Sequence, residues 1–104
     1  MNEHFHGMLT TGWVRLYLEN PHQSFEVTHA SFCNTSNATR NFSLCIVGPK
    51  DIPSKGNSHY WGKTIAGNDT VEHPAGFMIP PNHALFGLAS AGDSISYSFS
   101  GVHK

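Results

Sequence analysis

The sequence predicts an all-β protein, a single antiparallel β-sandwich that is jelly-roll-like, with about eight short strands. Short runs rich in β-branched and aromatic side chains recur along the chain, and Gly, Pro, Asn and Asp separate them about every eight to twelve residues. No segment shows the periodicity of a helix longer than about three turns. The 104 residues are sufficient for one domain with a small core.

We expect the chain to divide into an extended N-terminal arm, residues 1–11, and a β-sandwich domain, residues 12–104. The sequence of the arm, MNEHFHGMLTT, follows neither a helical nor a strand pattern. Because a polar terminus is ordered only when something holds it in place, the hypothesis is that this arm lies along a neighbouring subunit.

The first predicted strand covers residues 13–19, where apolar and polar positions alternate. Val14, Leu16 and Leu18 are expected to face the core, and the residues between them to face outward. A turn at residues 20–23, which contains a proline, ends this strand.

The next stretch, which we expect to organise the fold, is predicted to be a β-hairpin. Two apolar-rich runs, residues 24–33 and 42–47, flank a connection rich in Asn, Ser and Thr. Phe42, Leu44 and Ile46 share one face of the second run, and we place them in the core. Since a hairpin alone is not stable in water, later strands must supply the opposing sheet.

Cys33 and Cys45 would lie on the two arms of this hairpin. The absence of an apparent secretory segment favours free thiols, while a cross-strand disulfide remains an alternative.

The second half of the chain is expected to supply the remaining short strands. A loop rich in Pro and Gly occupies residues 48–58. In the last strand, residues 94–102, the side chains Ile95, Tyr97 and Phe99 alternate with serines and should face the core. The predicted short extended segments between these two are residues 60–65, 70–72, 77–79 and 84–89.

The composition excludes two classes of partner and favours a third. Six scattered Lys and Arg residues with a net charge of -1 form no basic stripe, which argues against binding to nucleic acid. No apolar run approaches about twenty residues, so we expect neither a signal peptide nor a membrane span. Charged residues make up only 12% of the chain, and such a weakly charged surface suits a subunit that partners cover.

No pattern in the sequence indicates catalytic, cofactor-binding or metal-binding residues, and we expect no enzyme. There is no Gly-x-Ser-x-Gly elbow, no paired carboxylates and no Gly-rich loop before a helix. His4 and His6 would share one side of an extended strand, as metal ligands can. No spacing among the eight histidines singles out further ligands, so we interpret them as surface and turn residues.

Aromatic residues are the best candidates for contact with another molecule. Trp13 and Tyr17 lie opposite the leucines of their strand, and Tyr60 with Trp61 could either stack on a sugar or a base or pack against a subunit. The candidate residues for a subunit interface are Phe5, Met8, Leu9, Trp13, Tyr17, Tyr60 and Trp61.

The run VTHASFCNTSNATRNFSLCIV, residues 27–47, combines an extended segment, a Cys-Asn-Thr-Ser turn and a strand that ends in an aliphatic pair. In this it resembles the small β-sandwich structural proteins of tailed bacteriophage virions. The resemblance spans residues 23–102, with no catalytic motif. Residues 1–11 and 13–19 match less well, and His22-Gln23 stands where a Pro-Ala-Gly type of turn is expected. Further similar segments follow at residues 63–72, 76–85, 89–96 and 98–102.

This resemblance implies a non-enzymatic structural protein of a bacteriophage virion, namely a capsid decoration or cement protein that bridges neighbouring shell subunits. The alternatives are a neck, tail or baseplate subunit, and a glycan-binding module for host attachment that uses Tyr60, Trp61 and the loop at residues 48–58. The implied partners are the major capsid protein or neck and tail subunits, with a homo-oligomer expected and a trimer favoured. The implied location is the virion, on the capsid surface or tail, after assembly in the host cytoplasm.

Overall fold

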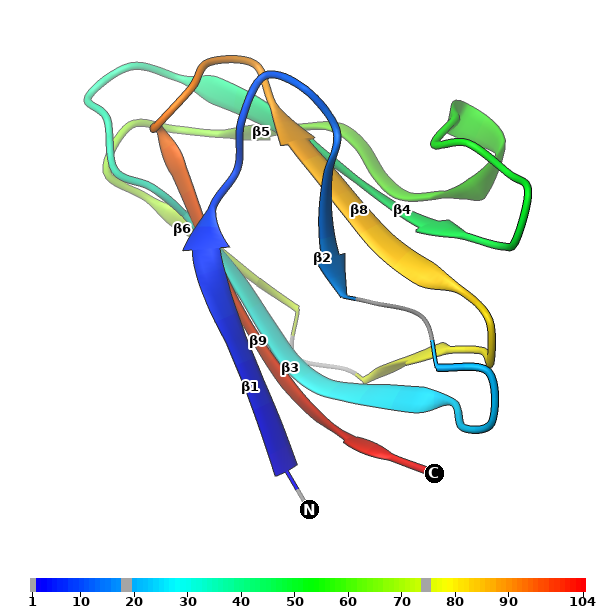
Figure 1. Cartoon of the computed structure of the whole chain (residues 1–104). Coiled ribbons are helices and arrows are strands. Elements are labelled where there is room, and N and C mark those ends of the chain that lie inside the picture. The colour runs from blue at the N-terminus through cyan, green and yellow to red at the C-terminus, as the bar shows by residue number, and fades with distance from the viewer. Residues whose placement is uncertain (1, 18–19, 74–75) are drawn as a thin grey trace.

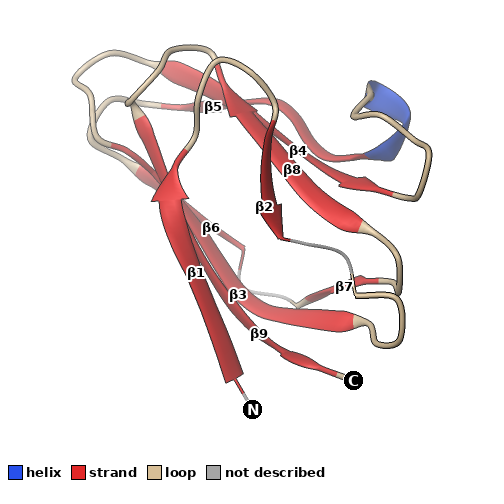
Figure 2. Cartoon of the chain, in the orientation of Figure 1, coloured by secondary structure: helices blue, strands red, loops and turns tan. Residues whose placement is uncertain are grey.

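The computed structural model describes residues 2–17, 20–73 and 76–104, which form two β-sheets packed face to face (Figures 1 and 2). Within these residues there is one short 3-10 turn, η1 (Lys55–Asn57), and no helix long and apolar enough to cross a membrane. The strands are β1 (Asn2–Met8), β2 (Val14–Tyr17), β3 (Phe25–Asn34), β4 (Arg40–Val47), β5 (Ser58–Ile65), β6 (Thr70–His73), β7 (Phe77–Ile79), β8 (Ala84–Ala89) and β9 (Ile95–His103).

The strand order is that of a jelly roll. One sheet has the order β1-β9-β3-β6, with β7 also paired to β3, and the other has the order β2-β8-β4-β5. All pairs are antiparallel. The pairs β1–β9, β2–β8, β3–β6 and β4–β5 are nested, as in a long hairpin that has been rolled into two sheets. The predicted jelly-roll-like sandwich is therefore confirmed.

The core lies between the sheets and is rich in aromatic side chains. Phe32 of β3 stacks on Phe42 of β4 across the two sheets, with ring centroids 4.5 Å apart. The expected core faces of two strands are confirmed, since Phe42 and Leu44 in β4 and Ile95 and Phe99 in β9 are fully buried. Ile46 and Tyr97 pack against this cluster from its margin.

The predicted hairpin between residues 24–33 and 42–47 is wrong. Both segments are strands, β3 and β4, but β3 pairs with β9, β6 and β7, whereas β4 pairs with β8 and β5 in the other sheet. The buried side chain of Asn34 sets the path between them. Its amide donates to the carbonyl oxygens of Ala38 and Ile65 at 2.7 and 3.0 Å, and this holds the chain in a turn that crosses between the sheets.

The two cysteines are free thiols and lie on opposite sheets. Cys33 is in register with Ser96 of β9, while Cys45 is in register with Phe86 of β8. Because both positions face away from the core on their own sheet, the alternative of a disulfide between them is excluded.

The N-terminal segment differs from the expected arm. Asn2–Met8 forms β1, which pairs with β9 of the same chain along its whole length. Phe5 stacks on Phe99 of β9 with ring centroids 4.9 Å apart, so it belongs to the sandwich. The strand pattern is hidden in the sequence because Glu3 and Gly7, which share the inward side with Phe5, are not apolar.

Tyr17 also differs from its predicted outward position, because it is buried beside Leu16. The pairing of β2 with β8 shifts between Arg15 and Tyr17. Such a bulge interrupts the two-residue alternation, and it turns the Tyr17 ring inward against Phe25. The predicted core position Leu18 lies outside the described residues.

Candidate functional site

The outer face of the β2-β8-β4-β5 sheet carries a group of large apolar side chains. We define the tryptophan face as Trp13, Trp61, Phe86 and Leu88. Phe86 and Leu88 alternate with buried residues along β8, and in the register of the sheet they lie next to Arg15 of β2 and Ser43 of β4. An outer sheet face in a sandwich is normally polar, so these residues mark a candidate contact surface.

The two tryptophans come from opposite edges of this sheet and meet on its outer face. Trp13 directly precedes β2 and Trp61 lies in β5, yet their ring centroids are only 6.2 Å apart with the planes tilted by 34°. Trp61 is 47% exposed. Two adjacent indole rings, one of them open to solvent, form a surface suited to apolar contact with another molecule.

A bulge in β5 directs Trp61 outward. Phe42 pairs with Lys63 and Leu44 pairs with Tyr60, so Ser43 of β4 faces two residues of β5. The second of these is Gly62, with a φ of +64°, and its N–H donates to the hydroxyl of Ser43 at 2.9 Å. As a result Tyr60 packs against the core while its neighbour Trp61 points away from it.

Arg15 adds a positive charge at the margin of the tryptophan face. Its guanidinium carbon lies 5.3 Å from the centre of the Phe86 ring. A cation over an aromatic ring is stabilised by the ring quadrupole, and the arginine stem covers part of the ring. The face therefore combines neighbouring aromatic groups with one oriented cation.

The outer face of the other sheet is different in character. Its central strand β9 presents Ser96, Ser98 and Ser100, and β1 adds His4 and His6. The imidazoles of His4 and His6 share one side of β1, with centroids 5.8 Å apart, as their spacing predicted. Across the described part of the chain, no group of three or more His, Cys, Asp or Glu side chains is arranged to hold a metal ion.

The residues predicted for a subunit interface lie at different depths. Trp61 and Met8 are exposed, and Trp13 is half-buried beside Trp61. Phe5 and Tyr60 are half-buried against the core. Leu9 and Tyr17, at 0% and 5% exposure, belong to the core of this chain.

Phe86 and Leu88 were not singled out from the sequence. The segment ALFGLA is apolar at every position, so its alternation does not tell the inward face from the outward face. This segment has more apolar residues than one face of a strand can bury, and that excess is the sequence signal for apolar side chains on its outer face.

A pair of histidines connects the two sheets at the edge formed by β5 and β6. The Nε2 atoms of His59 and His73 are 2.9 Å apart, and the His59 ring stacks on Phe77 with centroids 4.4 Å apart. Burial, and then the proximity of His73, lower the pKa of His59 below its ordinary value. In the neutral pair one Nε2–H donates to the other Nε2, so the pair acts as a hydrogen bond between the sheets.

The comparison with solved structures found chains that are similar to this one. No family model and no curated protein matches the chain. A chain from the structure of infectious bursal disease virus, Gx strain, is similar to it with 13% sequence identity and a TM-score of 0.43, covering 98% of this chain and 30% of that chain. This chain thus spans less than a third of the length of that viral chain. The jelly-roll assignment rests on the strand order described above.

Proposed function

We propose that this chain is a non-enzymatic structural subunit of a virion, which binds a neighbouring virion protein through its tryptophan face. The tryptophan face is the observation that carries the proposal. Jelly rolls serve both as viral capsid domains and as lectins, and a fold alone does not determine function. The surface that this particular jelly roll presents therefore decides between these functions.

The tryptophan face has the composition of the centre of a protein interface. Aromatic side chains and arginine are enriched at such centres, and lysine and acidic residues are depleted. Trp13, Trp61, Phe86 and Arg15 lie together here. Since burial of apolar surface is the main favourable term in most protein association, covering this face with a partner is expected to stabilise the assembly.

The low charge of the whole chain supports the same proposal. With 12% charged residues and a net charge of -1, electrostatic repulsion between copies is weak. Copies can therefore be placed close together on a regular shell, where a highly charged subunit would repel its neighbours.

The specific role we propose is decoration or cementing of the capsid of a tailed bacteriophage. In this role the chain contacts the major capsid protein. It forms a symmetric homo-oligomer, for which we propose a trimer. The resemblance of residues 27–47 to small phage virion proteins supports this choice of virus. A neck, tail or baseplate subunit is the alternative position for the same surface.

The test is the number and position of copies in purified virions, by quantitative mass spectrometry and electron cryomicroscopy. The proposal predicts many copies distributed over the head. A small number of copies at one vertex or along the tail would favour the neck or tail role over decoration. Absence of the chain from virions would contradict a structural role altogether.

A further inference from the structure

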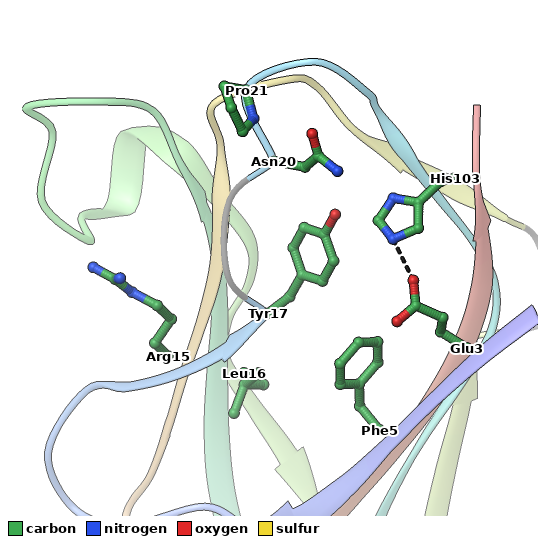
Figure 3. A pocket seen from close by; sticks show the side chains of 8 residues that line it. All are labelled: Glu3, Phe5, Arg15, Leu16, Tyr17, Asn20, Pro21 and His103. Atoms are coloured by element: carbon green, nitrogen blue, oxygen red, sulfur yellow. Dashed lines mark ion pairs between the residues drawn. The ribbon is translucent and has the colours of Figure 1, made fainter.

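A cavity of about 530 Å³ opens at the edge of the sandwich where β1 and β2 lie opposite each other. Figure 3 shows its lining side chains, which come from both sheets and from the turn after β2. Phe5 and Leu16 form apolar wall, and Glu3, Tyr17, Asn20 and His103 supply polar atoms. A volume of this size, with an apolar wall and a few polar groups, is typical of small-molecule sites.

Two buried polar atoms in this lining have no hydrogen-bond partner within the described residues. They are the hydroxyl oxygen of Tyr17 and Nδ1 of His103. The Tyr17 side chain is almost wholly buried, and its hydroxyl points into the space between Asn20 and His103 (Figure 3). Because buried polar groups are nearly always paired, two such atoms in one cavity indicate that a ligand supplies the missing partners.

The contacts around the cavity show which polar atoms are left for a ligand. Burial, and then the charge of Glu3, raise the pKa of Tyr17, so its hydroxyl is protonated at neutral pH and can donate. The carboxylate of Glu3 contacts Nε2 of His103, so that nitrogen donates to it and Nδ1 is the ring atom left for a ligand.

Asn20 is held in one orientation beside these groups. Its Oδ1 accepts the backbone N–H groups of His22 and Gln23 at 2.8 and 3.1 Å. Since the oxygen is used by the turn, the amide nitrogen is the atom that remains to donate toward a ligand. Its contact with the Gln23 side chain is long, at 3.5 Å.

We propose that this cavity binds a small, uncharged, polyhydroxylated ligand, namely a single sugar unit. Each sugar hydroxyl both donates and accepts, which matches the donors at Tyr17 and Asn20 and the acceptor at Glu3, and suits Nδ1 of His103 in either role. The half-buried ring of Phe5, which meets the Tyr17 ring edge to face with centroids 5.8 Å apart, gives an apolar surface for the C–H side of a sugar. Arg15 of the lining holds its guanidinium over Phe86, on the outer face of its sheet, and the carboxylate of Glu3 contacts His103, so an ionic ligand is not favoured.

The test is a titration of the ¹⁵N-labelled whole chain with free D-glucose, D-galactose and N-acetyl-D-glucosamine, followed by two-dimensional NMR. At least one of these sugars is expected to give saturable shifts at the backbone amides of Glu3, Tyr17 and His103. In the Tyr17→Phe variant the dissociation constant for that sugar should rise about two- to tenfold, as expected for one lost hydrogen bond. This variant removes a hydroxyl that makes no hydrogen bond to the described chain, so it should fold normally.

Tyr60→Phe is the matched control, since it removes a tyrosine hydroxyl from β5 and should leave the affinity unchanged. Three results would overturn the proposal. They are the absence of saturable shifts with all three sugars, shifts confined to Trp13 and Trp61, and unchanged affinity in Tyr17→Phe.

Discussion

At the scale of single residues, the crossing from β3 to β4 depends on the side chain of Asn34. This residue is fully buried and uses both ends of its amide. The nitrogen donates to the carbonyl oxygens of Ala38 and Ile65, and Oδ1 accepts from the N–H and the hydroxyl of Ser36 at 3.0 and 2.7 Å. The hydroxyl of Ser36 also lies 3.1 Å from the carbonyl oxygen of Ala38, so the two side chains hold this turn together.

We predict that Asn34→Ala lowers the free energy of unfolding by about 2–4 kcal/mol, because it removes the four hydrogen bonds of a buried amide. Urea denaturation monitored by tryptophan fluorescence measures this change. The matched control is Asn37→Ala in the same turn, whose exposed side chain should contribute little. Equal stability of the two variants would show that the amide of Asn34 does not hold the crossing.

Gly101 lies where the backbone of β9 closely approaches that of β3. A Cβ at this position would overlap the backbone carbonyl oxygen of Glu26, next to the point where the β3–β9 register shifts. Because the obstacle is backbone in a paired strand, we predict that Gly101→Ala destabilises the fold by about 3 kcal/mol or more. Thermal unfolding followed by circular dichroism measures this, with Gly12→Ala as the control, since its Cβ would meet no neighbouring atom. A melting temperature equal to that of the control would contradict the packing described here.

At the scale of elements, the histidine pair His59 and His73 makes the β5–β6 edge sensitive to acid. The pKa of His59 is lowered in the folded chain relative to its ordinary value of 6.5, so the unfolded chain binds this proton more readily. The stability that this neutral histidine contributes is complete above pH 6.5 and is lost as the pH falls through the lowered value.

The free energy of unfolding is therefore expected to fall between neutral and mildly acidic pH, and His59→Asn should reduce this dependence. Denaturant titrations of both proteins at a series of pH values measure the difference. Comparison with the parent chain removes the contributions of the other histidines. If the two curves run parallel through this range, the His59–His73 pair does not control the acid sensitivity.

Strand β1 gives a second prediction at this scale. Because β1 pairs along its whole length with β9 and places Phe5 on Phe99, we predict that deletion of residues 2–8 strongly lowers the melting temperature. Circular dichroism of the truncated chain measures this. A double variant, His4→Ala with His6→Ala, changes only outward side chains of β1 and should melt near the parent temperature. Retention of full stability after truncation would support the N-terminal arm expected from the sequence.

At the scale of the whole molecule, the sequence predicted the class of fold because turns and alternation are local properties. The last strand, predicted at residues 94–102 and found at Ile95–His103, follows directly from such a pattern. Pairing partners are not local. The segments 24–33 and 42–47 looked like a hairpin, yet their partners, β9 and β8, lie at the far end of the chain.

The same distinction explains which parts of the candidate sites could be predicted. The sequence indicates Trp13 and Trp61 as candidates for a subunit interface because aromatic residues suit such contacts. That they meet on one face depends on the order of four strands. The edge cavity brings Glu3 together with His103 from opposite ends of the chain. The burial of Tyr17 depends on a bulge in β2, and no pattern of residues in the sequence predicts this bulge.

The most direct test of the proposed virion role is a rebinding measurement with the tryptophan face altered. Virions assembled without this chain would be incubated with purified protein, and bound copies counted by quantitative mass spectrometry. We predict saturable binding for the parent chain and a loss of about tenfold or more in affinity for Trp61→Ser, as expected for a central aromatic residue. Ile52→Ser, which changes an exposed apolar residue outside the tryptophan face, should bind like the parent. Equal binding by Trp61→Ser and the parent chain, or no binding by either, would contradict the account.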